Sequence, residues 1–235
     1  MARPSRFVSL ERSLPFKCVA AELFGEGKGE WLSEEETRYI SGCVPRRITE
    51  FAAGRACARF ALGQLGLPTR TIPVLPDRRP RWPRSVVGSI SHTNGYCTAL
   101  VAAKSTIRSV GVDCETVGAI TSDLWPIVYT IAEREWLCAL SRHRQAIGAA
   151  LLFAAKESAF KCQFALTGDW WEFHDVEITA ELPPESNNFS ARCLRDKHKD
   201  LPMAMHGVSL LRDQFIVTAN WISHTAASPV HALQE

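Results

Sequence analysis

The sequence lacks the patterns that mark several common protein classes. It contains eight cysteines but no Cys-x-x-Cys pair, which argues against a structural zinc site. No apolar run is long enough for a signal peptide or a membrane span, and the candidate at 16–24 is broken by Lys17 and Glu22. The formal net charge is only +2, and no nucleic-acid-binding signature is present. These absences favour a protein of the reducing cytoplasm that binds no nucleic acid.

Two short stretches of the chain instead carry three carboxylates and two ammonium groups. Three oxygen ligands suit a hard divalent cation such as Mg²⁺, and lysine side chains suit phosphate oxygens. The combination therefore indicates chemistry on a diphosphate. The five side chains are those of Asp113, Glu115, Lys156, Glu157 and Lys161.

The local spacing favours convergence of the carboxylates. The alternating segment 107–115 predicts a strand, on which Asp113 and Glu115 share a face. Glu157 and Lys161 are four apart in a helical pattern, so they lie one turn apart on one face. Each pair alone is ordinary, because Glu–Lys pairs are common on exposed helices and acidic residues are common at strand ends. Only the two together indicate a site.

The remaining pattern predicts a mixture of helices and strands. Long helices are expected at 46–65 and 145–166, and a hairpin turn is expected at Asn94-Gly95. Capping boxes are predicted at Ser33/Glu36 and at Thr130/Glu133, and a further strand at 72–75.

Four blocks in the same order resemble the Sfp-type 4′-phosphopantetheinyl transferases, and within them the enterobactin synthetase component D group. The first position of the last block is Phe153, where that group commonly has Trp. Four ordered blocks are more specific than one short motif. The blocks are an Arg-x₇-Arg helix within 46–55, a Trp-Pro … Gly-Ser-Ile-Ser-His stretch at 81–92, the Gly-Val-Asp-x-Glu strand at 111–115 and the Phe-x-x-Lys-Glu-x-x-x-Lys helix at 153–161.

The resemblance implies a transfer of 4′-phosphopantetheine from coenzyme A to a serine of an apo acyl, peptidyl or aryl carrier protein, with release of adenosine 3′,5′-bisphosphate. It implies that Asp113, Glu115 and Glu157 bind Mg²⁺, with Mn²⁺ as an alternative ion. The implied catalytic groups are Glu157, Lys161 and Asp113. Glu157 would accept the serine proton, directly or through a bound water.

The resemblance also implies a coenzyme A site. Lys156 and Lys161 would contact the diphosphate, and Asp113 would act there through its ion. The other implied coenzyme A contacts are Arg47, Arg55, Arg78, Arg79, Ser91 and His92 at the nucleotide end, and Trp170 and Trp171 near the pantetheine arm.

The fold implied by the resemblance is α/β (α+β), built as two similar halves in a pseudo-twofold arrangement. Each half is a small sheet packed on a long helix, and the active site lies in the cleft between them. We expect an N-terminal half at 1–110 with the nucleotide contacts, and a C-terminal half at 111–235 with the metal ligands and the catalytic helix. Both halves in one chain suggest a monomer.

The carrier protein is not specified by the sequence. Fatty acid, polyketide and nonribosomal peptide synthesis remain open, including siderophore pathways such as an enterobactin synthase complex. Carrier domains of this kind are acidic, so we expect them to suit the basic helix face near Arg55 and Arg59.

Two other functions fit the same residues. A metal-dependent phosphodiesterase or pyrophosphatase would use the same carboxylates and lysines, and would cleave coenzyme A without a carrier protein. A non-catalytic binder of coenzyme A or of carrier proteins would bind tightly and form no product.

Overall fold

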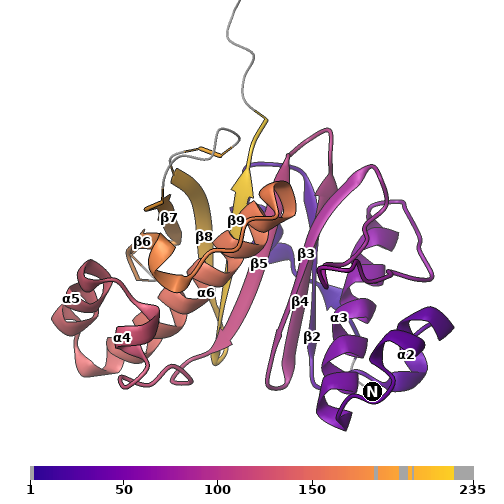
Figure 1. Ribbon diagram of the computed structural model, residues 1–235, viewed down its shortest axis with the longest axis horizontal. Coiled ribbons are helices and arrows are strands. Elements are labelled where there is room, and N and C mark those ends of the chain that lie inside the picture. The colour runs from indigo at the N-terminus through magenta and orange to yellow at the C-terminus, as the bar shows by residue number, and fades with distance from the viewer. Residues whose placement is uncertain (1–2, 183–184, 196–200, 203, 225–235) are drawn as a thin grey trace, which may run out of the picture.

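The computed structural model describes residues 3–182, 185–195, 201–202 and 204–224. Within these residues the chain forms two antiparallel sheets, each packed against one long helix (Figure 1). The four-stranded sheet has the order β1-β2-β4-β3, and the five-stranded sheet has the order β5-β9-β8-β7-β6. The sheets lie side by side where β3 runs next to β5.

The first sheet and its helices come from the N-terminal part of the chain. The β3–β4 hairpin turns at Asn94-Gly95, where Gly95 has φ 75°, so the predicted hairpin is confirmed. The elements are β1 (Ser5–Arg6), α1 (Val8–Ser13), β2 (Cys18–Phe24), the 3₁₀ helix η1 (Gly29–Trp31), α2 (Glu34–Ile40), α3 (Pro45–Gln64), β3 (Val86–Thr93) and β4 (Tyr96–Ala103).

The second sheet and its helices follow. α6 ends at Gly168, which has the left-handed conformation that favours glycine. Among the described residues no helix is both long and apolar enough to cross a membrane. The elements are β5 (Ser109–Thr116), α4 (Trp125–Val128), α5 (Ile131–Ala139), α6 (Arg142–Thr167), the 3₁₀ helix η2 (Phe173–Asp175), β6 (Val176–Ala180), β7 (Asn188–Cys193), β8 (Ala204–Arg212) and β9 (Phe215–Ile222).

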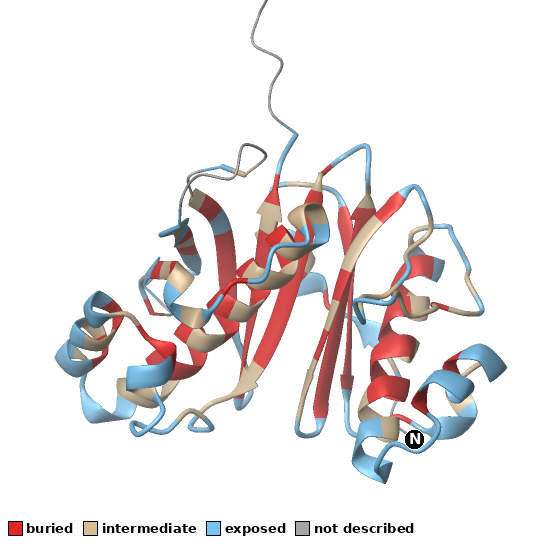
Figure 2. Ribbon diagram, in the orientation of Figure 1, coloured by how far each residue is buried: buried red, intermediate tan, exposed pale blue. Residues whose placement is uncertain are grey.

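Three apolar clusters hold the layers together. One lies between α3 and the first sheet, and another lies between α6 and the second sheet. The third lies between the two sheets, on the faces that point away from α3 and α6. It includes Phe7 and Leu10 from the α1 region. Figure 2 shows the resulting burial along β2, β4, β5 and the sheet-facing sides of α3 and α6. The predicted architecture of two α/β halves, each with a sheet on a long helix, is confirmed.

A buried glutamate fixes the start of α2 against α3. Glu36 closes the predicted capping box by accepting a hydrogen bond from the Ser33 backbone N–H at 2.9 Å. Its carboxylate also accepts from the Ile72 N–H at 2.9 Å and from Arg59 Nη1 at 2.8 Å. The Glu36 side chain is fully buried, so these contacts satisfy a charge that water does not reach.

The C-terminal half repeats this arrangement. Glu133 accepts from the Thr130 N–H at 2.8 Å, from the Ile178 N–H at 2.7 Å and from Lys156 Nζ at 2.9 Å. The interval from capping residue to glutamate to helix cation is the same in both halves. We call Glu36 and Glu133 with these partners the two glutamate anchors.

The predicted long helices at 46–65 and 145–166 are confirmed as α3 and α6. The strand predicted at 72–75 is wrong. Pro73 has no N–H to donate, and Val74 makes only an isolated bridge to Pro80. The Ile72 N–H is used by Glu36.

β5 and α6 approach each other closely at Gly111. A Cβ placed there would overlap the Ser158 carbonyl oxygen and would lie 2.7 Å from the Cys162 nitrogen. Only glycine therefore allows the strand that carries Asp113 to lie this close to the helix that carries Lys161.

We expect Gly111→Ala to lower the free energy of unfolding by about 3 kcal/mol or more, because the methyl group meets helix backbone that cannot rotate away. The matched control is Gly63→Ala on α3, where an added Cβ has no neighbour within 4 Å. That change should stabilise by about 0.5–1 kcal/mol through helix propensity. Urea unfolding of both variants checks this, and equal stabilities would contradict the close approach.

Candidate active site

A cavity of about 480 Å³ lies between the two halves, with α3 and β3 on one side and β5 and α6 on the other. It brings together most of the predicted site residues. Those from the N-terminal half are Arg47, Arg55, Arg78, Ser91 and His92. Those from the C-terminal half are Asp113, Glu115, Glu157 and Lys161.

Asp113 is the buried centre of this cavity. Its Oδ1 accepts hydrogen bonds from Lys161 Nζ and from Ser91 Oγ, both at 2.6 Å. Lys161 also lies 3.2 Å from Ser91 Oγ, so β3, β5 and α6 meet at one polar cluster. The other oxygen of Asp113, Oδ2, is buried and has no hydrogen-bond partner. A buried carboxylate oxygen without a partner is costly, so this atom is suited to a ligand.

Two further carboxyls beside Asp113, those of Glu115 and Glu157, have raised pKa values. Burial raises the pKa of Glu115 to about 7, and the charge of Asp113 adds to this shift. Burial also raises the pKa of Glu157, against the opposing effect of Lys161. Burial acts to lower the pKa of Lys161, but Asp113 and Glu157 outweigh it and the net shift is upward. Lys161 is therefore the ammonium group that interacts with all three of these carboxyls.

The donor set fits a hard divalent cation. Carboxylate oxygens are the ligands that Mg²⁺ prefers. A positive charge among them would lower the raised pKa values of Glu115 and Glu157. Within the described part of the chain, no three His, Cys, Asp or Glu side chains are arranged so that they could hold a metal ion. Asp113, Glu115 and Glu157 have the ligand atoms that the ion needs, and they line one cavity. Their oxygens do not converge on one point in this structure.

The opposite side of the cavity is cationic. Arg47 Nη1 lies 2.9 Å from His92 Nε2, and burial lowers the pKa of His92, which keeps the ring neutral and able to accept this hydrogen bond. Glu50 lies 3.7 Å from His92 and 3.8 Å from Arg47. Sequence reasoning did not select Glu50, although it is one helical turn from Arg47.

The prediction that a basic helix face near Arg55 and Arg59 docks carrier proteins is wrong. Arg55 is only 5% exposed and faces the cavity. The side chain of Arg59 is 17% exposed and is held by Glu36 and by the Trp31 carbonyl oxygen. Neither side chain is free to form a docking surface.

The position of Lys156 does not support its predicted diphosphate contact. Its side chain is 1% exposed, and its Nζ pairs with Glu133. The same atom donates to the carbonyl oxygens of Phe173 and Val176. Lys156 therefore belongs to a glutamate anchor on the far side of α6 from Asp113, and Lys161 is the lysine that reaches the cavity.

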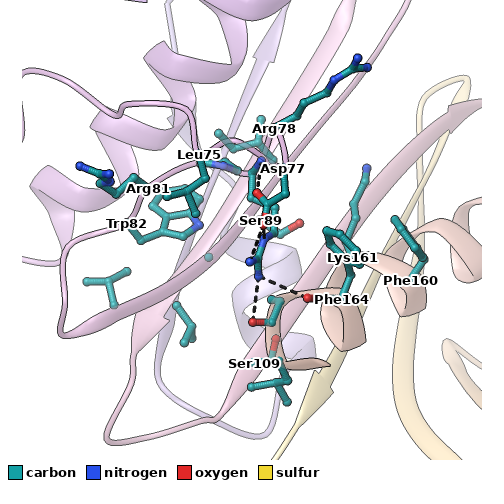
Figure 3. A pocket seen from close by; sticks show the side chains of 18 of the residues that line it. Leu75, Asp77, Arg78, Arg81, Trp82, Ser89, Ser109, Phe160, Lys161 and Phe164 are labelled. Carbon is teal, nitrogen blue, oxygen red and sulfur yellow. Dashed lines mark hydrogen bonds and ion pairs between the residues drawn. The ribbon is translucent and has the colours of Figure 1, made fainter. Parts of the chain in front are cut away.

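Arg79 is also engaged away from the predicted nucleotide site. Its Nη1 donates to the carbonyl oxygens of Phe164 and Ala165 at the end of α6, and Asp77 holds its other side at 2.6 Å. The segment 75–82 thus bridges to α6 across a second cavity of about 800 Å³. Figure 3 shows this cavity, with Trp82 on one wall and Phe160 and Phe164 on the other.

The two tryptophans follow the end of α6 and differ in burial. Trp170 is 64% exposed and packs edge-on against Phe160, whereas Trp171 is buried in the core of the C-terminal half. Both line a third cavity of about 130 Å³, together with Glu157. Glu157 thus faces both this cavity and the one around Asp113.

We expect Lys156→Met to lower the free energy of unfolding by about 3–5 kcal/mol, because Glu133 would stay buried without its cation. The double change Glu133→Gln with Lys156→Met should recover much of this loss. Urea unfolding measures both. A Lys156→Met protein as stable as the wild type would contradict the structural role.

Two family models match successive parts of the chain. The family model "4'-phosphopantetheinyl transferase N-terminal domain" matches residues 35–102, and the model "4'-phosphopantetheinyl transferase superfamily" matches residues 109–215. The first match contains α2 to β4, and the second begins at β5 and reaches β9.

Several curated proteins are similar to the chain over most of its length. The 4'-phosphopantetheinyl transferase Svp of Streptomyces mobaraensis is 42% identical over 187 residues, 77% of this chain and 74% of Svp. The 4'-phosphopantetheinyl transferase PptT of Mycobacterium tuberculosis is 36% identical over 75% of this chain and 78% of PptT. Enterobactin synthase component D of Escherichia coli K12 is 36% identical over 49% of this chain and 54% of its own length.

Among solved structures, the holo-[acyl-carrier-protein] synthase of Thermotoga maritima aligns at 24% identity over 48% of this chain and 62% of that chain, with a TM-score of 0.36. This score is too low to add to the description of the fold. The sequence similarity to Svp and PptT over three quarters of each chain is decisive: the protein is an enzyme that belongs to the 4′-phosphopantetheinyl transferase superfamily.

Proposed function

We propose that the protein transfers 4′-phosphopantetheine from coenzyme A to a serine hydroxyl of an apo carrier protein. The observation that carries this proposal is that Arg47 and His92 share one cavity with the Asp113–Lys161 cluster. A cationic wall suits the phosphates of a nucleotide, and an acidic wall with one lysine suits a diphosphate that binds together with a cation.

Coenzyme A would lie across the cavity from the N-terminal to the C-terminal half. Its nucleotide end would contact Arg47, Arg55, Ser91 and His92, with Arg78 at the rim, and its diphosphate would contact Lys161. The pantetheine arm would pass Glu157, which lines both cavities, and reach the smaller cavity beside Trp170 and Trp171.

Asp113, Glu115 and Glu157 would hold Mg²⁺, or Mn²⁺ in its place. The unpartnered Oδ2 of Asp113 and the raised pKa values of the two glutamates support this assignment. When bound, the ion would supply positive charge that stabilises the charge developing on the diphosphate.

The serine Oγ would attack the β-phosphorus of coenzyme A. The new bond is Oγ–P, and the bond that breaks joins this phosphorus to the bridging oxygen, so adenosine 3′,5′-bisphosphate leaves with the bonding electron pair. Lys161 would stabilise the negative charge on the phosphoryl oxygens.

Glu157 would accept the proton that the serine loses. A serine hydroxyl is a weak nucleophile at neutral pH, so the reaction needs a base. Burial raises the pKa of Glu157, which makes its ionised form a stronger base than an exposed glutamate.

The acceptor would be an acyl, peptidyl or aryl carrier protein of fatty acid, polyketide or nonribosomal peptide synthesis. The similarity to enterobactin synthase component D suggests siderophore assembly among these. We also propose that the enzyme acts as a monomer, because one chain supplies both walls of the cavity. The eight cysteines are all free thiols, which fits a cytoplasmic location.

The test is intact mass spectrometry of an apo acyl carrier protein incubated with the enzyme, coenzyme A and Mg²⁺, with an EDTA control. A gain of one phosphopantetheine unit that EDTA prevents is the expected result. Hydrolysis of coenzyme A without modification of several unrelated carriers would replace the proposal with a phosphodiesterase. Binding of coenzyme A without either product would replace it with a binder.

We expect Asp113→Asn to lower the transfer rate by at least about 100-fold, because the change removes the charge that orders Lys161 and would bind the ion. The exposed Asp123→Asn is the matched control and should act like the wild type. Circular dichroism of both variants checks the fold. Near-normal transfer by Asp113→Asn would remove the metal assignment.

We expect Glu157→Gln to lower kcat by about 10²–10⁴-fold while coenzyme A affinity changes little, because an amide cannot accept the serine proton. Exposed Glu135 on α5 supplies the control Glu135→Gln. Steady-state kinetics and calorimetric binding of coenzyme A separate the two effects. An equal loss of binding and turnover would make Glu157 a ligand and not the base.

A further inference from the structure

The two glutamate anchors differ in charge. Glu133 pairs with Lys156, which gives one negative and one positive group. Glu36 pairs with Arg59 at 2.8 Å and also lies 3.8 Å from Arg55 Nε, so this carboxylate faces two guanidinium groups. The anchor of the N-terminal half therefore has a net charge of +1, counting Glu36, Arg55 and Arg59, and the anchor of the C-terminal half is neutral.

The surplus charge belongs to Arg55, which is buried and yet lines the cavity. Its guanidinium lies 4.2 Å from the centroid of the Phe51 ring. Burial lowers the pKa of Arg55 to about 10, and Glu36 opposes this shift, so the group is still cationic at neutral pH. A buried cation with surplus charge at a cavity wall is suited to an anion.

The backbone of one residue, Ile72, connects Glu36 to Arg55. The Ile72 N–H donates to Glu36 Oε1 at 2.9 Å, and the Ile72 carbonyl oxygen accepts from Arg55 Nε at 2.9 Å. Glu36 thus holds the segment after α3 from one side, and that segment holds the guanidinium from the other. The bond from Nε and the ring of Phe51 hold the guanidinium at the cavity wall.

We propose that Glu36 is a positioning residue that acts through Ile72 and Arg55 to orient a guanidinium toward the phosphates at the nucleotide end of the substrate. The inference rests on the proposed function for the identity of that substrate. Glu36 itself is fully buried in its capping box and does not line the cavity. Its contribution is to affinity, and the chemical step at Asp113 and Glu157 is separate from it.

The test compares Glu36→Gln with Glu133→Gln. The two positions share the capping box, the burial, the backbone N–H partner and the pairing with a long-helix cation, so both changes remove the same kind of interaction. Melting temperatures report the structural loss, which should occur in both variants. Calorimetric binding of adenosine 3′,5′-bisphosphate reports the nucleotide end alone, and steady-state kinetics with coenzyme A and a carrier protein separate KM from kcat.

For Glu36→Gln we expect affinity for adenosine 3′,5′-bisphosphate to fall about tenfold and KM for coenzyme A to rise equally, with kcat within about twofold of the wild type. Glu133→Gln should lose stability and keep the nucleotide affinity of the wild type. Unchanged or tighter nucleotide binding by Glu36→Gln would overturn the inference. So would an equal loss of affinity in both variants.

If Glu36→Gln does not fold, Arg55→Lys decides the question. The lysine keeps the charge but lacks the planar guanidinium that Ile72, Phe51 and Glu36 hold. A loss of nucleotide affinity about as large as that of Arg55→Met supports positioning, and an affinity near the wild type overturns it. A wild-type protein that binds the nucleotide but modifies no carrier would refute the proposed function and leave this comparison of affinities valid.

Discussion

A carboxylate buried at the start of a short helix in each half fixes where the long helix of that half lies. Burying a charge costs several kcal/mol unless every oxygen is satisfied. Glu36 and Glu133 meet this demand in the same way, with a capping N–H, a backbone N–H from a later segment and a cation on α3 or α6. Such a set of contacts is satisfied in one geometry only. The position of each long helix over its sheet, and hence the walls of the cavity, depends on it.

The two halves are joined by polar contacts as well as by the apolar layer between the sheets. Ser91 and Lys161 meet on Asp113 at the cavity floor. At the opposite face, Arg212 on β8 donates to Glu22 on β2 at 3.0 Å, and Glu22 also accepts from the Tyr96 hydroxyl. The carboxylates of Glu22 and Asp113 are buried, so a relative movement of the halves would leave each of them without its cation. The shape of the cavity therefore depends on both halves.

Local sequence rules predicted the parts of this structure that depend on neighbours along the chain. The shared strand face of Asp113 and Glu115, the helical turn from Glu157 to Lys161 and the capping boxes are of this kind. The same rules also contain a signal against Lys156. Adjacent helical residues point about 100° apart, so Lys156 does not follow Glu157 toward the cavity around Asp113.

Long-range pairing was beyond those rules. The four-residue spacing of Arg55 and Arg59 predicts one basic face. Nothing near them in the sequence shows that both pair with Glu36, which lies on another helix. The repeated capping box and helix cation, at the same interval in each half, was the sequence signal of an internal repeat. In the structure, Glu36 and Glu133 are both buried and make the same kinds of contact, so the repeated residues have the same role in each half.

The charges of the cavity are separated in a way that couples its ligands. Arg47 and Arg55 lie on one wall with Glu50, and Asp113, Glu115 and Glu157 lie on the other with Lys161. Asp113 holds the Lys161 ammonium at 2.6 Å, so a phosphate oxygen gains that ammonium only at the expense of this ion pair. A second positive charge on the carboxylates would remove the cost. An anion and a cation should therefore each raise the affinity of the cavity for the other, and the arrangement favours a substrate that brings both.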